Sequence, residues 1–372
     1  MPEVLELFTE LAAIPSPPGE ERPVADVVAA YLRDCALEVH EDDAGERVGA
    51  TAGNLYARVE ATAPGRPIFL CAHLDTVPPT GDIRPVVGDD GVVRNAAGTI
   101  LGADDKAAVA VMLDATRRVL SERRPNAGIE LVFTPKEEVG LLGAAAFDHR
   151  RLHARHGFVY DQAAPIGDVI LGAPFSQALE VTFHGRAAHA GMYPEEGRNA
   201  IAAAARAIAD LRLGRIDDES SANVGVIAGG TAGNIVAETC TFVAEVRCHD
   251  ERKLASLVQE VIDSCSFAAQ VGECRVDVEQ RKSYRGYRFK RDDEVVQLAA
   301  DALARSGYEA RYRLSGGAAD ANVFNERGLA CLNLANGMQD IHTPDERITV
   351  DDLEGMVEVT LALVDVARDA DA

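Results

Sequence analysis

The chain has 372 residues, of which 47% are hydrophobic, and its formal net charge is −23 at pH 7. This length allows one large domain or two ordinary ones, each with a buried core. The acidic surplus argues against nucleic-acid binding, which needs a basic surface, and against docking on anionic membranes. We also find no run apolar and long enough to be expected to span a bilayer.

Periodic patterns predict alternating helices and strands in the first part of the chain. Apolar residues recur at helical spacing over residues 4–13, 22–35 and 105–120. Strand patterns cover residues 54–60, 68–72, 128–134 and 157–160, and a Gly- and Asp-rich hairpin or loop covers residues 80–98. Strands that alternate with helices indicate a largely parallel α/β sheet.

The pattern changes in the middle of the chain. Strands are expected over 177–184, 221–228, 235–247 and 273–281, and helices over 200–213 and 251–269. This is the β-α-β-β-α-β order of a ferredoxin-like α+β unit. The α/β pattern then returns, with helices over 294–306 and 351–367 and a strand over 329–334. We therefore predict a mixed α/β domain made of residues 1–175 plus 285–372, interrupted by a smaller domain over residues 176–284.

The cysteines and the N-terminus bear on the compartment. Seven cysteines are spread along the chain without a Cys-x-x-Cys pair, which favours reduced thiols over a disulfide framework or a thiolate metal site. The first residues lack the basic and apolar regions of a secretory signal. A cytoplasmic protein is expected.

Polar residues that could bind metal follow several predicted elements. His73 and Asp75 come at the end of a buried strand, where residues two apart point the same way. The others are the pairs Asp104-Asp105 and Glu137-Glu138, then Asp161 and His342. Taken singly, each motif has an ordinary structural explanation, such as an acidic helix cap or a solvated helix start. Together, imidazole and carboxylate ligands suit Zn, Co or Mn.

In their order along the chain, these segments resemble the M20 family of metallopeptidases, most closely its peptidase T-like (tripeptidase-like) branch. The resemblance implies a catalytic domain of the zinc-peptidase type that binds two divalent metal ions, with Zn favoured and Co or Mn as alternatives. His73 and Asp161 would bind one metal, Glu138 and His342 the other, and Asp104 both. A water bridging the metals would be the nucleophile.

The resemblance also implies roles for residues around the metals. Glu137 would be the general base, and Asp75 would orient His73. The peptide bond between Asp104 and Asp105 would be cis. The inserted domain would act as a lid that also mediates dimerisation, and three of its residues would bind substrate: His189, Asn234 and Arg247. In the Gly-rich segment 315–322, Ala318-Ala319 replaces a Ser or Thr that the family usually has, so the substrate hydrogen bond of that hydroxyl is not expected here.

We therefore predict a tripeptide aminopeptidase-like enzyme whose partner is a short peptide, with a homodimer formed through the lid. Three alternatives stay open. Two are other M20 activities, an N-acyl amino acid deacylase or a dipeptidase, because these would share the hydrolytic core. The third is a non-catalytic binding relative, which an intact Glu137 and a full ligand set argue against.

Overall fold

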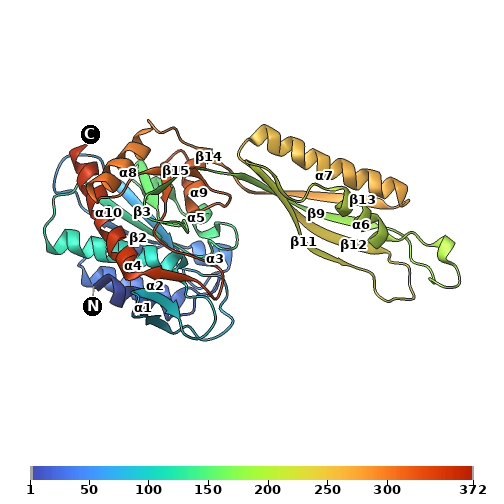
Figure 1. Cartoon of the computed structure of the whole chain (residues 1–372), viewed down its shortest axis with the longest axis horizontal. Coiled ribbons are helices and arrows are strands. Elements are labelled where there is room, and N and C mark those ends of the chain that lie inside the picture. Colours follow the sequence, from blue (N-terminus) through green and yellow to red (C-terminus); the bar gives the residue numbers. More distant parts are fainter. Residues whose placement is uncertain (1–2, 371–372) are drawn as a thin grey trace. The chain divides into compact units, whose positions relative to one another are not determined.

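The computed structural model describes residues 3–370 and divides the chain into two compact units (Figure 1). The first unit runs up to Gly172 and resumes at Arg288, and the second is Ala173–Tyr287. Among the described residues, no helix combines the length and apolarity needed to cross a membrane.

A nine-stranded mixed sheet forms the centre of the first unit. Its strands are β1 (Val39–Glu41), β2 (Leu55–Val59), β3 (Ile68–His73), β6 (Ile129–Thr134), β7 (His156–Val159), β8 (Asp168–Ala173), β14 (Tyr287–Arg288), β15 (Arg311–Leu314) and β16 (Ala330–Leu334). The order is β1-β2-β6-β3-β7-β16-β8-β14, with β15 also paired to β8. The central strands β6, β3, β7 and β16 are parallel, which confirms the predicted sheet type. Consequently their carboxyl ends meet at one edge, where ligands bind in such sheets.

Helices cover both faces of this sheet. They are α1 (Glu3–Ala12), α2 (Arg22–Asp34), α3 (Ala44–Val48), α4 (Ala103–Ser121), α5 (Leu142–Ala146), α8 (Glu294–Arg305), α9 (Asp320–Glu326) and α10 (Val350–Asp369), together with the short 3₁₀ turn η1 (His149–Arg151). Leu70 of β3 joins the core that contains α4, whereas the ring of its neighbour Phe69 lies 4.9 Å from that of Phe324 in α9. Adjacent strand residues point to opposite faces, so every residue of β3 is buried.

The predicted hairpin region contains β4 (Pro85–Val87) and β5 (Val92–Asn95). β5 also pairs with β17 (Arg347–Thr349), which begins just after the segment that carries His342. This pairing brings the late segment beside the loop that leads from β5 into α4.

The second unit is an antiparallel sheet of order β10-β11-β12-β9-β13. Its elements are β9 (Phe175–His184), η2 (Pro194–Glu196), α6 (Ala200–Asp210), β10 (Gly214–Asp217), β11 (Ser220–Gly229), β12 (Thr239–Cys248), α7 (Glu251–Val271) and β13 (Arg275–Tyr284). α6 and α7 pack on one face of the sheet over an apolar core (Figure 1). Apart from the short edge strand β10, this is the ferredoxin-like arrangement predicted from the sequence.

Candidate metal centre

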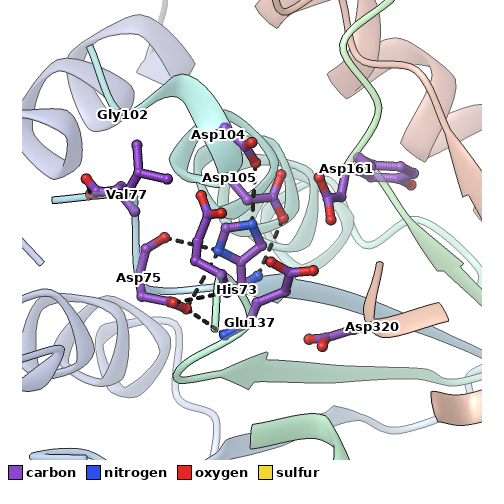
Figure 2. Close-up of polar contacts among 12 residues, drawn as sticks. His73, Asp75, Val77, Gly102, Asp104, Asp105, Glu137, Asp161 and Asp320 are labelled. Atoms are coloured by element: carbon purple, nitrogen blue, oxygen red, sulfur yellow. Dashed lines mark hydrogen bonds and ion pairs between the residues drawn. The ribbon is translucent and has the colours of Figure 1, made fainter. Parts of the chain in front are cut away.

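His73 is the last residue of β3, and its side chain is 2% exposed. Its Nδ1 lies 2.8 Å from the backbone carbonyl oxygen of Asp75 (Figure 2). A carbonyl oxygen can only accept a hydrogen bond, so Nδ1 donates. Nε2, which is 3.2 Å from Oδ1 of Asp104, is therefore the nitrogen left to bind a metal ion.

The side-chain carboxylate of Asp75 has different partners from its backbone carbonyl. It is 0% exposed and accepts the backbone N–H groups of Glu137 at 2.9 Å and Glu138 at 3.1 Å. Its Oδ1 lies 3.6 Å from Nδ1 of His73, which is longer than the bond made by the carbonyl. The main chain of Asp75 thus orients the imidazole, while its side chain fixes the turn that carries the two glutamates.

Asp104 lies at the start of α4, and its peptide bond to Asp105 is cis. Oδ1 faces His73, and Oδ2 lies 3.1 Å from Nε2 of His342. Burial opposes ionisation of this carboxyl, but the two imidazoles hold its pKa below the usual range. A single carboxylate therefore lies between two imidazoles, the arrangement of a ligand shared by two metals.

His342 reaches this carboxylate from the late segment of the chain. Its Nε2 is also 3.0 Å from Oε1 of Glu138. Hydrogen bonds to Asp104 and Glu138 raise the pKa of His342 to about 10. His342, Glu138 and Asp104 therefore come together around Nε2 of His342.

Asp161 and Glu137 also lie close to His73. Ligand atoms of His73, Glu137 and Asp161 all lie within 4.8 Å of one another, and so do those of His73, Asp104 and Glu138. Burial raises the pKa of both Glu137 and Asp161 well above the usual range, and the negative charge of the neighbouring carboxylates raises it further. A divalent cation would offset this crowding of acids, so the imidazole and carboxylate donors fit a metal site.

Comparison with known proteins identifies the family. The model of peptidase family M20/M25/M40 matches residues 69–366. This chain belongs to the M20 peptidases. It is 36% identical to the uncharacterized protein YqjE of Bacillus subtilis, over 98% of both chains. Among solved structures, the aminopeptidase PepT of Bacillus cereus is 36% identical with a TM-score of 0.89, over 98% of both chains. A tripeptidase of Staphylococcus aureus is 32% identical with a TM-score of 0.94, over 99% of this chain and 98% of that one.

The chain is therefore a hydrolase, and the predicted family resemblance is confirmed. Three predicted substrate residues of this M20 peptidase lie in the second unit. His189 and Asn234 are neighbours there, since His189 forms a bridge with Ile235 and the Asn234 carbonyl accepts from the N–H of Ala190 at 2.9 Å. Arg247 lies near the other end of β12, where it pairs with Glu245 at 2.9 Å.

Three residues near the M20 site had no role assigned from the sequence. Asn333, in the otherwise apolar β16, accepts the N–H of Asp161 at 3.0 Å and donates to its carbonyl at 2.7 Å. Asp320 begins α9 and accepts a hydrogen bond from Thr134, and burial raises the pKa of Asp320 to about 6. Glu346 accepts three backbone N–H groups of the loop before α4. Two of them had a visible signal: Asp320 lies in the Gly-rich segment 315–322, and Asn333 is a polar residue inside a buried strand.

Proposed function

We propose that this protein is a two-metal aminopeptidase that removes the N-terminal residue from tripeptides and other short peptides. The observation that carries the proposal is the Asp104 carboxylate, whose oxygens lie 3.2 Å from Nε2 of His73 and 3.1 Å from Nε2 of His342. Similarity to the Bacillus cereus aminopeptidase and the Staphylococcus aureus tripeptidase supports the substrate class.

In this proposal His73 and Asp161 hold one metal, Glu138 and His342 hold the other, and Asp104 bridges them. Zn²⁺ is the favoured ion because imidazole and carboxylate are ligands it commonly takes, with Co²⁺ and Mn²⁺ as alternatives. When bound, such a pair lowers the pKa of a water molecule and polarises a peptide carbonyl.

Glu137 is the proposed general base. Its pKa is raised by burial and by the carboxylates around it, so its carboxylate holds a proton more firmly than an exposed glutamate would. The bond from its backbone N–H to Asp75 fixes where its side chain starts. Glu137 would take a proton from the attacking water and then deliver it to the nitrogen of the departing amine.

The lid residues would bind the substrate. Nδ1 of His189 accepts the backbone N–H groups of Gly191 and Met192, each at 3.2 Å, so in the neutral ring the proton is on Nε2. That N–H is suited to stabilise negative charge on the scissile carbonyl oxygen. Asn234 would bind the peptide backbone, and Arg247 a terminal carboxylate, to which guanidinium binds through two hydrogen bonds.

The distance between these lid residues bears on the oligomer. On β12, Thr239 pairs with His184 near the His189 end, and Arg247 pairs with Ser176. The eight-residue step along the strand corresponds to roughly 27 Å, whereas an extended tripeptide spans only about 10 Å. One lid unit therefore does not bring both His189 and Arg247 to the same bound tripeptide.

A homodimer through the lid is the proposed assembly. β10 pairs only with residues 220–222 of β11, and no other described strand pairs with that side of β11. In the rest of the strand, Val226 is 60% and Ile227 is 51% exposed. Such an apolar edge favours pairing with another strand, and a second copy of the chain is the proposed partner. Val226→Lys should convert dimer to monomer in analytical ultracentrifugation; a wild-type monomer would exclude this assembly.

A cytoplasmic location is also part of the proposal. All seven cysteines are free thiols in the structure, as expected in a reducing compartment. Periplasmic or secreted protein in fractionated cells of the source organism would contradict it.

The test of the function compares three substrates in the presence of Zn²⁺ or Co²⁺: a tripeptide with a free N-terminus, its N-acetylated form, and an N-acetyl amino acid. Release of the first amino acid from the free tripeptide alone is the expected result. Release only from the N-acetyl amino acid would replace the aminopeptidase with a deacylase that uses the same metal site. Cleavage of none of them would leave the proposed activity without support.

A further inference from the structure

Glu346 lies on the same late segment as His342, and its side chain is only 2% exposed. Oε2 accepts the backbone N–H groups of Leu101 and Gly102, both at 2.8 Å, and Oε1 accepts that of Asp104 at 3.0 Å. A buried carboxylate needs such partners, and hydrogen bonds to a charged acceptor are stronger than neutral ones. The loop from Leu101 to Asp104 is thus held by one side chain from a distant part of the sequence.

This loop sets the position of Asp104. An aspartate has only two side-chain torsions, so the place of its carboxylate follows closely from the place of its main chain. The loop also packs closely against Thr76, because a Cβ added at Gly102 would lie 3.3 Å from Cγ2 of that residue. Thr76 follows His73 and Asp75, so the loop is fixed between the His73 segment and Glu346.

A carboxylate shared by two metals must be placed more accurately than one that binds a single metal. Asp104 must present one oxygen toward His73 and the other toward His342, and a displacement that improves one contact lengthens the other. Residues 342–346 meet both needs at once, since His342 contacts the carboxylate of Asp104 while Glu346 fixes its main chain. Lys106 is a buried cation whose ammonium donates to the backbone carbonyl of Ile14, and the charge of Glu346 also acts on it.

We propose that Glu346 is a positioning residue for the shared metal ligand Asp104, and that it raises metal affinity without touching metal or substrate. This inference rests on the two-metal site of the proposed function. Residues 342–346 would then do two things: supply His342, and hold the backbone of Asp104 where its carboxylate reaches both His73 and His342.

The test uses Glu346→Gln, which keeps the size of the side chain but replaces one acceptor oxygen with an amide donor. Glu354→Gln is the matched control, because Glu354 is exposed on α10 in the same unit and loses the same charge. Co²⁺ and Zn²⁺ affinities are measured by titration against a competing chelator, beside the visible absorption of the Co²⁺ protein. Glu346→Gln should weaken metal binding by about 10- to 100-fold and change the Co²⁺ spectrum. Glu354→Gln should match wild type in both.

The outcomes separate this inference from the proposed function. Metal affinity and spectrum equal to wild type in a folded Glu346→Gln protein would overturn the positioning role. So would a lower melting temperature of the metal-free protein with an unchanged dissociation constant, since that result describes a purely structural residue. A wild-type chain that takes up no divalent metal would overturn the two-metal proposal itself, and this inference with it.

A second measurement decides the matter if Glu346→Gln does not fold. Glu346→Asp keeps the charge but shortens the reach, and it should lose metal affinity in the same direction by a smaller factor. In the wild-type protein, the amides of Leu101, Gly102 and Asp104 should exchange hydrogen slowly with and without metal. Exchange as fast as that of exposed loop amides would overturn the proposed clamp.

Discussion

Asp75 offers a direct test of how the site is built, because its main chain and its side chain have separate tasks. Its buried carboxylate accepts two backbone N–H groups, from Glu137 and Glu138. Asp75→Ala leaves both donors unpaired. Each hydrogen bond to a charged group contributes about 1.5–3 kcal/mol, so the loss should be about 3–6 kcal/mol in the free energy of unfolding. Asp75→Asn keeps one acceptor oxygen, but a neutral one that binds more weakly, so it should lose more than half of that.

The assay is urea unfolding of the metal-free protein, monitored by circular dichroism. The quantity compared is the free energy of unfolding of the first unit. Asp82→Asn is the control, because Asp82 is exposed in a loop of the same unit. The loss should be present without metal, since the bonds to the two glutamates do not depend on it. A metal-free Asp75→Ala protein that unfolds at the wild-type urea concentration would refute the reasoning. Asp75 would then return to the role that the family resemblance implies, orienting the His73 ring.

The other predictions concern the metals and the proton. Glu137→Gln should keep its metal content but lower kcat by about 10²- to 10⁴-fold, the usual contribution of a general base, and near-normal turnover would remove Glu137 from that role. His342→Ala should reduce bound metal from two ions to one per chain by elemental analysis, whereas unchanged stoichiometry would mean that His342 is not a ligand. Metal binding at pH 7 should release protons, because the pKa of His342 is raised to about 10 without metal and a ligand imidazole must be neutral. Affinity should therefore rise with pH, and calorimetry in buffers of different ionisation enthalpy should show less proton release for His342→Ala.

Local patterns were enough to predict the elements that carry the site. Residues 68–72 and 128–134 read as buried strands because strands covered on both faces are apolar throughout, and they are β3 and β6. Neither β8 nor β15 was predicted from the sequence. β8 has six residues, but its apolar run is only Val169 to Leu171 and is broken by Gly172, and β15 has only four residues, of which two are arginines. The strand expected from residue 235 begins at Thr239, because the residues before it bridge to the His189 loop instead.

The candidate ligands were visible as histidines and acids at element ends, and the structure brings His73, Asp104, Glu138, Asp161 and His342 together. Their roles in binding metal remain predictions. The groups that hold them in place were hidden for a physical reason. Backbone N–H groups have no signature in the sequence, so the bonds to Glu346 could not be foreseen. The use of the Asp75 carbonyl in place of its carboxylate was equally invisible, since both belong to one residue.

The order of strands in the large sheet has a consequence for synthesis of the chain. β16 lies between β7 and β8, although it is made long after both. While the ribosome adds the second unit, from Ala173 to Tyr287, the early strands have a gap where β16 will insert. The gap stays open from the end of β8 at Ala173 to the end of β16 at Leu334, and at about 5–20 residues per second this takes roughly 8–32 s. His342 follows β16, so the metal ligands are complete only once the gap has closed, and a nascent chain that stalls in between exposes two unpaired strand edges.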